Sequence, residues 1–372
     1  MSGDNRKGRL AAFHSEASNL VGGDSNGVAD VFVYTRPSGF RAAGGTLRRV
    51  SVTDSGGQAN GPSTNPSLDG RVLLGDGNRP PHCVAFQSEA SNLTASDRDT
   101  TSDIFVRDLR RNRTILVSRG IGAAATNPAI DGSCRTVGFE AGGRVYLAGV
   151  GGSVRSLGRG DQVDLALDGE GVVWVAGGKI TFRRAGRTSK VGPGANPTVS
   201  DGERIGPRTL WAVSFQTRAS LVRRDHNPGL DVYTRVLAQR GGPRATDLIS
   251  APRRGAGSLG GDNENGGLTA YAARRGIIVF VNHRESGSYL FYRNNHSGNI
   301  DDLAVAGKDQ SGIERPRRAA AAQEADRAIT EVSISARSNW VAFSSTSQNF
   351  PFDGDGHVED VFFKHLIDGQ SI

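Results

Sequence analysis

The sequence predicts an all-β protein, a single β-propeller built from four-stranded antiparallel blades. Two observations carry this prediction. Short runs rich in Val, Thr and Ser are bounded by Gly, Asn, Asp and Pro, and one strand–loop–strand unit recurs along the chain. Gly accounts for 51 of the 372 residues, as many short strands separated by turns require. We expect seven blades, with six or eight as the alternatives.

The recurring unit is clearest in four segments, which begin at Ala11, Val84, Val213 and Val341. Each has an apolar strand ending in Phe and a polar residue, then an Asp-bearing loop, then a strand of the D-V-F-V type. The hexapeptide SEASNL is identical in the first two segments. Period-two patterning after a turn indicates an antiparallel pair of strands.

Two further strands complete each unit. One is short, as in LRRVSV from Leu47 and RTILVS from Arg113, and the next begins with Asn-Pro, as in NPSLDG and NPAIDG. Four antiparallel strands per repeat make a propeller blade. We expect the first unit to lack the strand before its Phe strand and the last unit to lack its closing strand.

Three weaker units bring the count to seven, and all seven belong to one domain over residues 1–372. A stretch of strong helix formers after a Pro predicts a helical insertion over 315–328. The aromatic residues should pack between blades, because each blade buries its faces on its neighbours. The anchor aromatics, one per unit, are Phe13, Phe86, Phe139, Trp174, Phe215, Phe280 and Phe343, and those on the neighbouring strand are Phe32, Phe105, Tyr233 and Phe362.

The pattern S-x-D-G-R-x-V-A-F-x-S-x-A-S-N-L, followed by D-x-N-G-x-x-D-x-F-V, resembles the WD40-like, TolB-type β-propeller repeats common in bacterial exported proteins. The likeness is strong over residues 13–33, 69–109 and 341–363. The resemblance implies the propeller fold and a periplasmic or secreted location, whereas function follows from a fold much less directly. The start of the sequence, MSGDNRKGRLAAF, shows no apolar segment of a signal peptide.

Composition argues against two classes of protein. No stretch approaches the roughly 18 apolar residues of a membrane span. The net charge is +7, but the basic residues are scattered and lack the interleaved aromatics that stack nucleic-acid bases. The Arg excess fits genomic base composition as well as it fits phosphate binding. We expect a monomer without a membrane span or a nucleic-acid partner.

The two cysteines, Cys83 and Cys134, precede equivalent strands in neighbouring units. They lack CxxC spacing, which excludes a zinc site built on cysteine. They form either one disulfide between blades or two small buried residues.

The Asp-rich loop is the one candidate for chemistry. Its carboxylate and amide oxygens recur at positions i, i+2 and i+6, a spacing that lets them converge on calcium. The alternative is structural, with the first Asp forming an Asx-turn and the last bonding loop amides. The candidate ligands are Asp24, Asn26 and Asp30; Asp97, Asp99 and Asp103; Asp225, Asn227 and Asp231; and Asp353, Asp355, Glu359 and Asp360.

The third and fourth units replace the Asp loop with Gly-Gly pairs at 142–143 and 177–178, which suit a two-residue hairpin. The fold therefore does not need the longer loop, and ion binding or partner contact explains why it is there. The Asp-Gly pairs at Asp69, Asp131, Asp168 and Asp201 have a simpler interpretation, because Asp-Gly between two strands specifies a turn.

These observations predict a non-enzymatic binding scaffold, stabilised by calcium in its Asp loops, that meets a protein or peptide partner at a rim or in the central channel. No strand–turn–helix GxSxG motif occurs, and we assign no catalytic residue. The alternative is a carbohydrate- or peptide-acting hydrolase propeller, or the propeller half of a larger exported enzyme.

Overall fold

The computed structural model describes residues 9–37, 44–70, 81–238, 243–251, 259–269, 276–284, 287–294, 300–302, 329–335, 340–346 and 360–365. Within these ranges the chain forms strands, turns and loops and no helix, so it contains no helical segment able to cross a membrane. The insertion predicted over 315–328 lies outside the described residues. The chain divides into two compact units, with the main boundary at Gly177 inside the fourth sheet.

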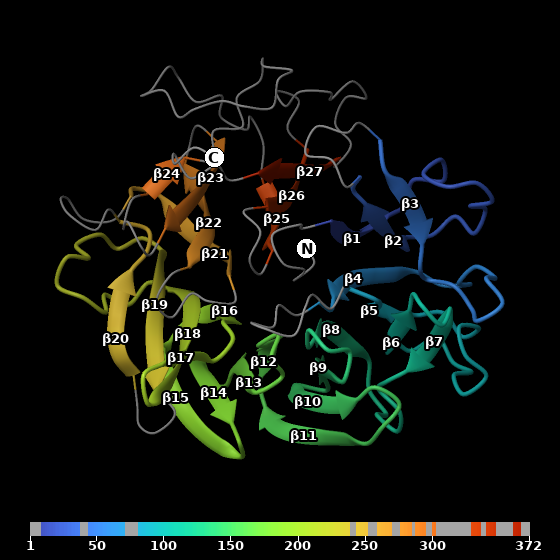
Figure 1. The fold of residues 1–372 in the computed structure, drawn as a ribbon, viewed down its shortest axis with the longest axis horizontal. Helices are drawn as coiled ribbons and strands as arrows, with labels where there is room; N and C mark the ends of the chain where they lie inside the picture. Colours follow the sequence, from blue (N-terminus) through green and yellow to red (C-terminus); the bar gives the residue numbers. More distant parts are fainter. Residues whose placement is uncertain are drawn as a thin grey trace. The chain divides into compact units, whose positions relative to one another are not determined.

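The first unit contains three sheets, which follow one another in chain order from blue to green in Figure 1. Blade 1 has three strands, β1 (Leu10–Ser15), β2 (Asp30–Thr35) and β3 (Thr46–Arg49). Blade 2 has four, β4 (Ser63–Leu68), β5 (Cys83–Ser88), β6 (Asp103–Asp108) and β7 (Arg113–Leu116). Blade 3 has β8 (Ala125–Ile130), β9 (Thr136–Ala141), β10 (Arg144–Gly149) and β11 (Val154–Arg159).

Blade 4, in which the boundary falls, has β12 (Asp161–Leu165), β13 (Gly171–Val175), β14 (Lys179–Arg184) and β15 (Arg187–Pro193). The second unit contains the remaining sheets. Blade 5 has β16 (Ala195–Val199), β17 (Glu203–Ile205), β18 (Arg208–Thr217), β19 (Asp231–Ala238) and β20 (Pro243–Leu248). Blade 6 has β21 (Asp262–Leu268), β22 (Ile277–Arg284), β23 (Gly287–Asn294) and β24 (Ile300–Asp302), and blade 7 has β25 (Ile329–Ile334), β26 (Trp340–Ser345) and β27 (Asp360–His365).

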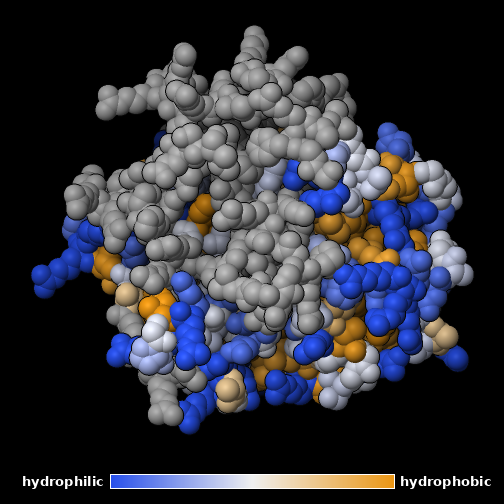
Figure 2. All heavy atoms as spheres, viewed as in Figure 1, coloured by the Kyte–Doolittle hydropathy of each residue, from blue (hydrophilic) through white to orange (hydrophobic). Residues whose placement is uncertain are grey.

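Apolar layers between consecutive sheets hold each unit together. In the first unit, one layer joins blades 1 and 2 around Val31 and Phe86, and a second joins blades 2 and 3 around Ile104 and Phe139. In the second unit, Phe280 of blade 6 lies in a layer with Val232 of blade 5. Hydrophilic side chains cover much of the described face of blades 1 to 3 in Figure 2, with apolar ones visible between them. The seven sheets are the blades of an all-β, seven-bladed propeller, which confirms the predicted fold class.

The seven anchor aromatics all lie on the strand predicted for them, and six of them stack on an aromatic residue directly opposite on the next strand. Ring centroids are 5.8 Å apart for Phe13 and Phe32 and 5.9 Å apart for Phe86 and Phe105. Such offset stacks add about 0.5–1.5 kcal/mol beyond burial. The sequence interpretation missed two partners, Tyr146 and Phe291.

The strand count differs from the prediction in blade 5. Blade 5 has a fifth strand, because β17 folds back on an extended β18 through a turn at Gly206 (φ 58°). Within the described residues, blade 1 begins with its Phe strand and blade 7 ends with the strand that carries Phe362.

The Asn-Pro strands are edge strands with a bulge. The register of β4, β8 and β16 shifts at Asn-Pro, and Asn65, Asn127 and Asn196 have φ of 50°, 52° and 47°. Pro removes a donor from the ladder, which an edge strand with a bulge tolerates. Gln87 follows Phe86, and its side-chain Oε1 atom accepts the backbone N–H of Asn127 at 3.0 Å. This hydrogen bond joins blade 2 to blade 3.

Candidate cation sites in the Asp loops

Three Asp loops lie within the described residues, and all make the same connection in their blades. They span residues 16–29 between β1 and β2, 89–102 between β5 and β6, and 218–230 between β18 and β19. Of the fourth set, Asp353, Asp355 and Glu359 lie outside the described residues, while Asp360 begins β27. Blades 3 and 4 make this connection with Gly-Gly turns whose residues all have positive φ, as predicted.

The last Asp of each loop has a structural partner that sequence analysis missed. Asp30, Asp103 and Asp231 each accept a hydrogen bond from a Ser hydroxyl two residues after the end of β3, β7 or β20: Ser51, Ser118 and Ser250. The same hydroxyls accept the backbone N–H of the residue after the Asp, at 3.0, 2.9 and 3.2 Å. This Asp position therefore fixes the start of β2, β6 and β19, and in each Asp one carboxylate oxygen is used for that purpose.

In blade 1 a guanidinium group lies between the two carboxylates of the loop. Arg49 Nη1 is 2.9 Å from Asp24 Oδ1 and 3.2 Å from Asp30 Oδ2. Asn26 donates its amide to Asp30 Oδ2 at 2.8 Å, so this side chain is a hydrogen-bond donor here. A cation supplied by the protein thus lies between the two carboxylates of the first predicted calcium site and offsets part of their charge.

In blade 5 a Tyr hydroxyl group, instead of a guanidinium group, contacts the first carboxylate of the loop. Tyr233 donates its hydroxyl proton to Asp225 Oδ2, and burial together with this hydrogen bond raises the pKa of Tyr233. Asn227 Oδ1 accepts the N–H of Gly229 at 2.8 Å, as an Asx-turn does. Asp231 Oδ1 accepts hydrogen bonds from Ser250 and from Asn263, at 2.6 and 3.2 Å. Most polar groups of this loop hold its own shape, while Asp225 Oδ1 is buried without a hydrogen-bond partner among the described residues.

In blade 2 three carboxylates converge. Asp97, Asp99 and Asp103 each place one oxygen within 4.8 Å of the other two. Burial raises the pKa of Asp97 and of Asp103, and the charges of Asp97 and Asp99 raise that of Asp103 further. Of the three predicted ligand sets that the structure describes, this one brings three carboxylates together.

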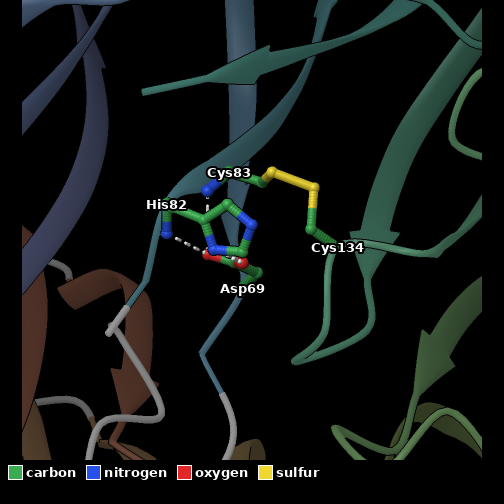
Figure 3. A group of neighbouring side chains, drawn as sticks. All are labelled: Asp69, His82, Cys83 and Cys134. Atoms are coloured by element: carbon green, nitrogen blue, oxygen red, sulfur yellow. Dashed lines mark hydrogen bonds and ion pairs between the residues drawn. A yellow bond between two sulfur atoms is a disulfide. The ribbon is translucent and has the colours of Figure 1, made fainter. Parts of the chain in front are cut away.

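A second group of neighbouring side chains lies where blades 2 and 3 meet. It consists of Asp69 with His82 and of Cys83 with Cys134. Cys83 on β5 and Cys134, in the loop between β8 and β9, form a disulfide, which decides between the two sequence alternatives. The Asp69 carboxylate accepts the backbone N–H groups of His82 and Cys83 at 2.7 and 2.9 Å. Figure 3 shows the imidazole of His82 against this carboxylate, with Nδ1 2.9 Å from Asp69 Oδ2. Because the disulfide consumes both thiols, the four residues do not form a thiolate metal site.

Two of the four Asp-Gly pairs lie in turns, as predicted, whereas the structure has no turn at Asp69-Gly70 or at Asp201-Gly202. Asp131 Oδ1 accepts the N–H groups of Arg135 and Thr136 at 2.7 and 3.2 Å, and Asp168 Oδ1 accepts that of Glu170 at 2.8 Å. Both carboxylates therefore bond the backbone of the loop that follows them.

The ion pair of His82 makes stability depend on pH. The hydrogen bond with Asp69 raises the pKa of His82 above the usual value near 6.5. The folded state thus holds the proton more tightly than the unfolded chain, so this stabilisation is complete below that value and is lost as the pH rises through the raised pKa. From about pH 6 to pH 8, we expect the wild type to lose up to about 1 kcal/mol more unfolding free energy than His82→Gln. Urea titrations at each pH measure this, and parallel pH profiles would contradict it.

Three arginines that join neighbouring blades were missed by the sequence interpretation. Each lies two residues after the second aromatic of its blade, and each donates to a backbone carbonyl of the preceding blade. Arg107 donates to Thr53 O at 3.0 Å, Arg293 to Ala251 O at 3.1 Å, and Arg235 to Val191 O. Arg107 and Arg293 are almost completely buried. The spacing F-V-R, Y-T-R and F-Y-R in the sequence is the signal that identifies them.

Comparison with known proteins adds the following. No protein-family model matches the sequence, and no curated protein does. Solved structures with a similar fold include TolB from Acinetobacter baumannii (TM-score 0.43, 12% identity, 80% of this chain and 63% of that one). Others are the acylaminoacyl peptidase of Pyrococcus horikoshii (0.43, 10%, 83% and 46%) and an oligogalacturonate lyase in complex with manganese (0.43, 8%, 82% and 85%). The chain thus spans less than two thirds of the TolB and peptidase chains.

Proposed function

We propose that the protein is a non-enzymatic scaffold that binds a protein or peptide partner through its Asp loops. One observation carries this proposal. The connection that takes fourteen residues in blade 2, 89–102, takes two in blade 3, at Gly142 and Gly143. The longer loop is therefore additional to what the blade needs for closure. Loops held on a rigid scaffold are where binding residues concentrate.

The loop of blade 2 and the strand connection of blade 1 beside it form one joined surface. Asn60 and Asn92 exchange contacts there, since Asn92 Oδ1 accepts the N–H of Asn60 at 3.0 Å and Asn92 Nδ2 donates to Gln58 O at 2.8 Å. Gln58 in turn accepts the N–H groups of Ser25 and Asn26 in the Asp loop of blade 1. These contacts fix the two loops in advance, which lowers the entropic cost of binding a partner.

The disulfide supports a location outside the cytoplasm. Disulfides form and persist in the periplasm and outside the cell, and they are rare in the reducing cytosol. The bond between Cys83 and Cys134 thus favours export on a ground independent of the TolB-type resemblance. A signal sequence encoded with this chain and a periplasmic or secreted pool in cell fractionation are the corresponding expectations.

A photo-crosslinking residue placed in the loop tests the partner proposal. Arg98 is exposed in the Asp loop of blade 2, and Arg111 is exposed in the turn at the opposite end of the same blade. In cells of the source organism, we expect crosslinked protein adducts from position 98 and far fewer from position 111. Mass spectrometry identifies the adducts.

Adducts that are equally abundant at both positions, or absent from position 98, would contradict the loop as a binding surface. Turnover of a peptide or oligosaccharide by the purified chain would favour the enzyme alternative instead. Loss of that turnover on mutation of a described residue would then locate the catalytic site.

A further inference from the structure

We propose that the Asp loop of blade 2 binds one calcium ion through Asp97, Asp99 and Asp103, and that the other two described Asp loops do not. This inference does not depend on the proposed partner binding. It narrows the prediction of equivalent calcium loops to one loop, because the structure shows different groups meeting the acids in each blade.

The buried carboxylate of Asp97 is the first argument. The residue is 5% exposed, and its Oδ2 atom is buried without a hydrogen-bond partner among the described residues. Asp225 Oδ1 of blade 5 is also unpaired, but that loop has two carboxylates and an amide where blade 2 has three carboxylates. Leaving a buried carboxylate oxygen unpaired costs several kcal/mol, so such groups are normally paired or bound to a metal. A cation at the convergence of the three carboxylates satisfies this oxygen.

The geometry fits the size of calcium. Calcium binds oxygen at about 2.3–2.6 Å, so two of its ligands lie at most about 5 Å apart. The three oxygens in blade 2 lie within 4.8 Å of one another. Asp99 is exposed at the loop surface, which leaves room for water to complete the six to eight ligands. Magnesium fits less well, because it demands a nearly ideal octahedron at shorter distances.

The other two loops offer different groups to their acids. Arg49 on β3 of blade 1 lies opposite Phe32, and the residue in the same register of blade 2, opposite Phe105, is Leu116 on β7. Blade 5 has Leu248 there, opposite Tyr233. Blade 1 thus supplies a guanidinium and blade 5 a Tyr hydroxyl, whereas blade 2 supplies Leu116 and Phe105, which offer neither.

Calcium-dependent thermal unfolding tests the proposal with CaCl2 as the probe. At about 10 mM calcium, a site with Kd of about 0.1–1 mM, as in extracellular modules, raises the midpoint by several degrees. We expect Asp97→Asn to lose most of this shift, and equilibrium dialysis to show one calcium fewer per chain. Asp24→Asn in blade 1 is the matched control and should keep the wild-type number of calcium ions.

Two reciprocal substitutions sharpen the test. Leu116→Arg places a guanidinium where blade 1 has one and should remove one calcium without removing any acid. Arg49→Leu leaves the two carboxylates of blade 1 without a guanidinium group, and it should lower the stability of the protein more without calcium than with it. If Leu116→Arg does not fold, the comparison of Asp97→Asn with Asp24→Asn decides alone. Equal calcium binding by the wild type and Asp97→Asn, or no binding by the wild type, would overturn the proposal.

Discussion

Replacing both cysteines, in Cys83→Ala/Cys134→Ala, is expected to lower the free energy of unfolding by about 4 kcal/mol. The bond closes a segment with a sequence separation of 51 residues. In the chain-entropy model, a crosslink of this span removes about 4 kcal/mol of loop-closure entropy from the unfolded chain. Cys83 is fully buried and packs in the apolar layer between blades 2 and 3, so Ala keeps most of the local packing.

Urea unfolding of the wild type and the double variant, without reductant, measures this difference. The control is the same pair with reductant in excess, where the wild type should approach the variant because it loses the crosslink too. A difference below about 1 kcal/mol without reductant would show that the disulfide restrains the unfolded chain little. Such a result would also weaken the argument from the disulfide to an oxidising compartment.

The blades could be predicted from the sequence because each carries its signal locally. An apolar strand with Phe86, a turn-rich loop and a strand with Phe105 lie within one short segment, and the same order recurs at Phe13 and Phe215. Period-two patterning and turn residues are enough to find such a unit. The residues of a weak unit such as that of Trp174 give little signal. Such a unit was found because the spacing of the stronger repeats predicts a blade at that place.

The state of each Asp loop could not be predicted in the same way. Asp24 and Asp97 hold the same position in their loops, and the sequences of the two ligand sets differ in the middle ligand, Asn26 against Asp99. The groups from elsewhere in the blade that distinguish the loops are Arg49 on β3 and Leu116 on β7. These residues come from beyond the next turn, and only the strand register shows that they occupy the same place. A sequence motif shows which ligands are present. The groups that compete with a metal ion for those ligands come from other strands, and only the folded structure shows where they lie.

The buried arginines were missed for a related reason. Genomic base composition is a sufficient explanation for scattered Arg residues in a basic chain, and the sequence alone does not show which of them are buried. The register shows Arg107 at the position after Val106 on β6, opposite Thr114. Its burial lowers its pKa, but the carbonyl groups around it favour a charged donor. A recurring Arg two residues after an aromatic is therefore a structural signal of this repeat.

Substituting one of these arginines is expected to lower the stability of the first unit markedly. Arg107→Met keeps the apolar stem and removes the guanidinium, which donates to Thr53 O at 3.0 Å and to Thr114 Oγ1 at 2.9 Å. Those acceptors then lose a charged donor, at a cost of about 2–3 kcal/mol in unfolding free energy. Arg111→Met is the control, because this side chain is 79% exposed and its loss should cost less than about 0.5 kcal/mol. Chemical denaturation of the two variants compares them directly. If they were equally stable, Arg107 would only fill space between blades 1 and 2, and the repeated arginine would need another explanation.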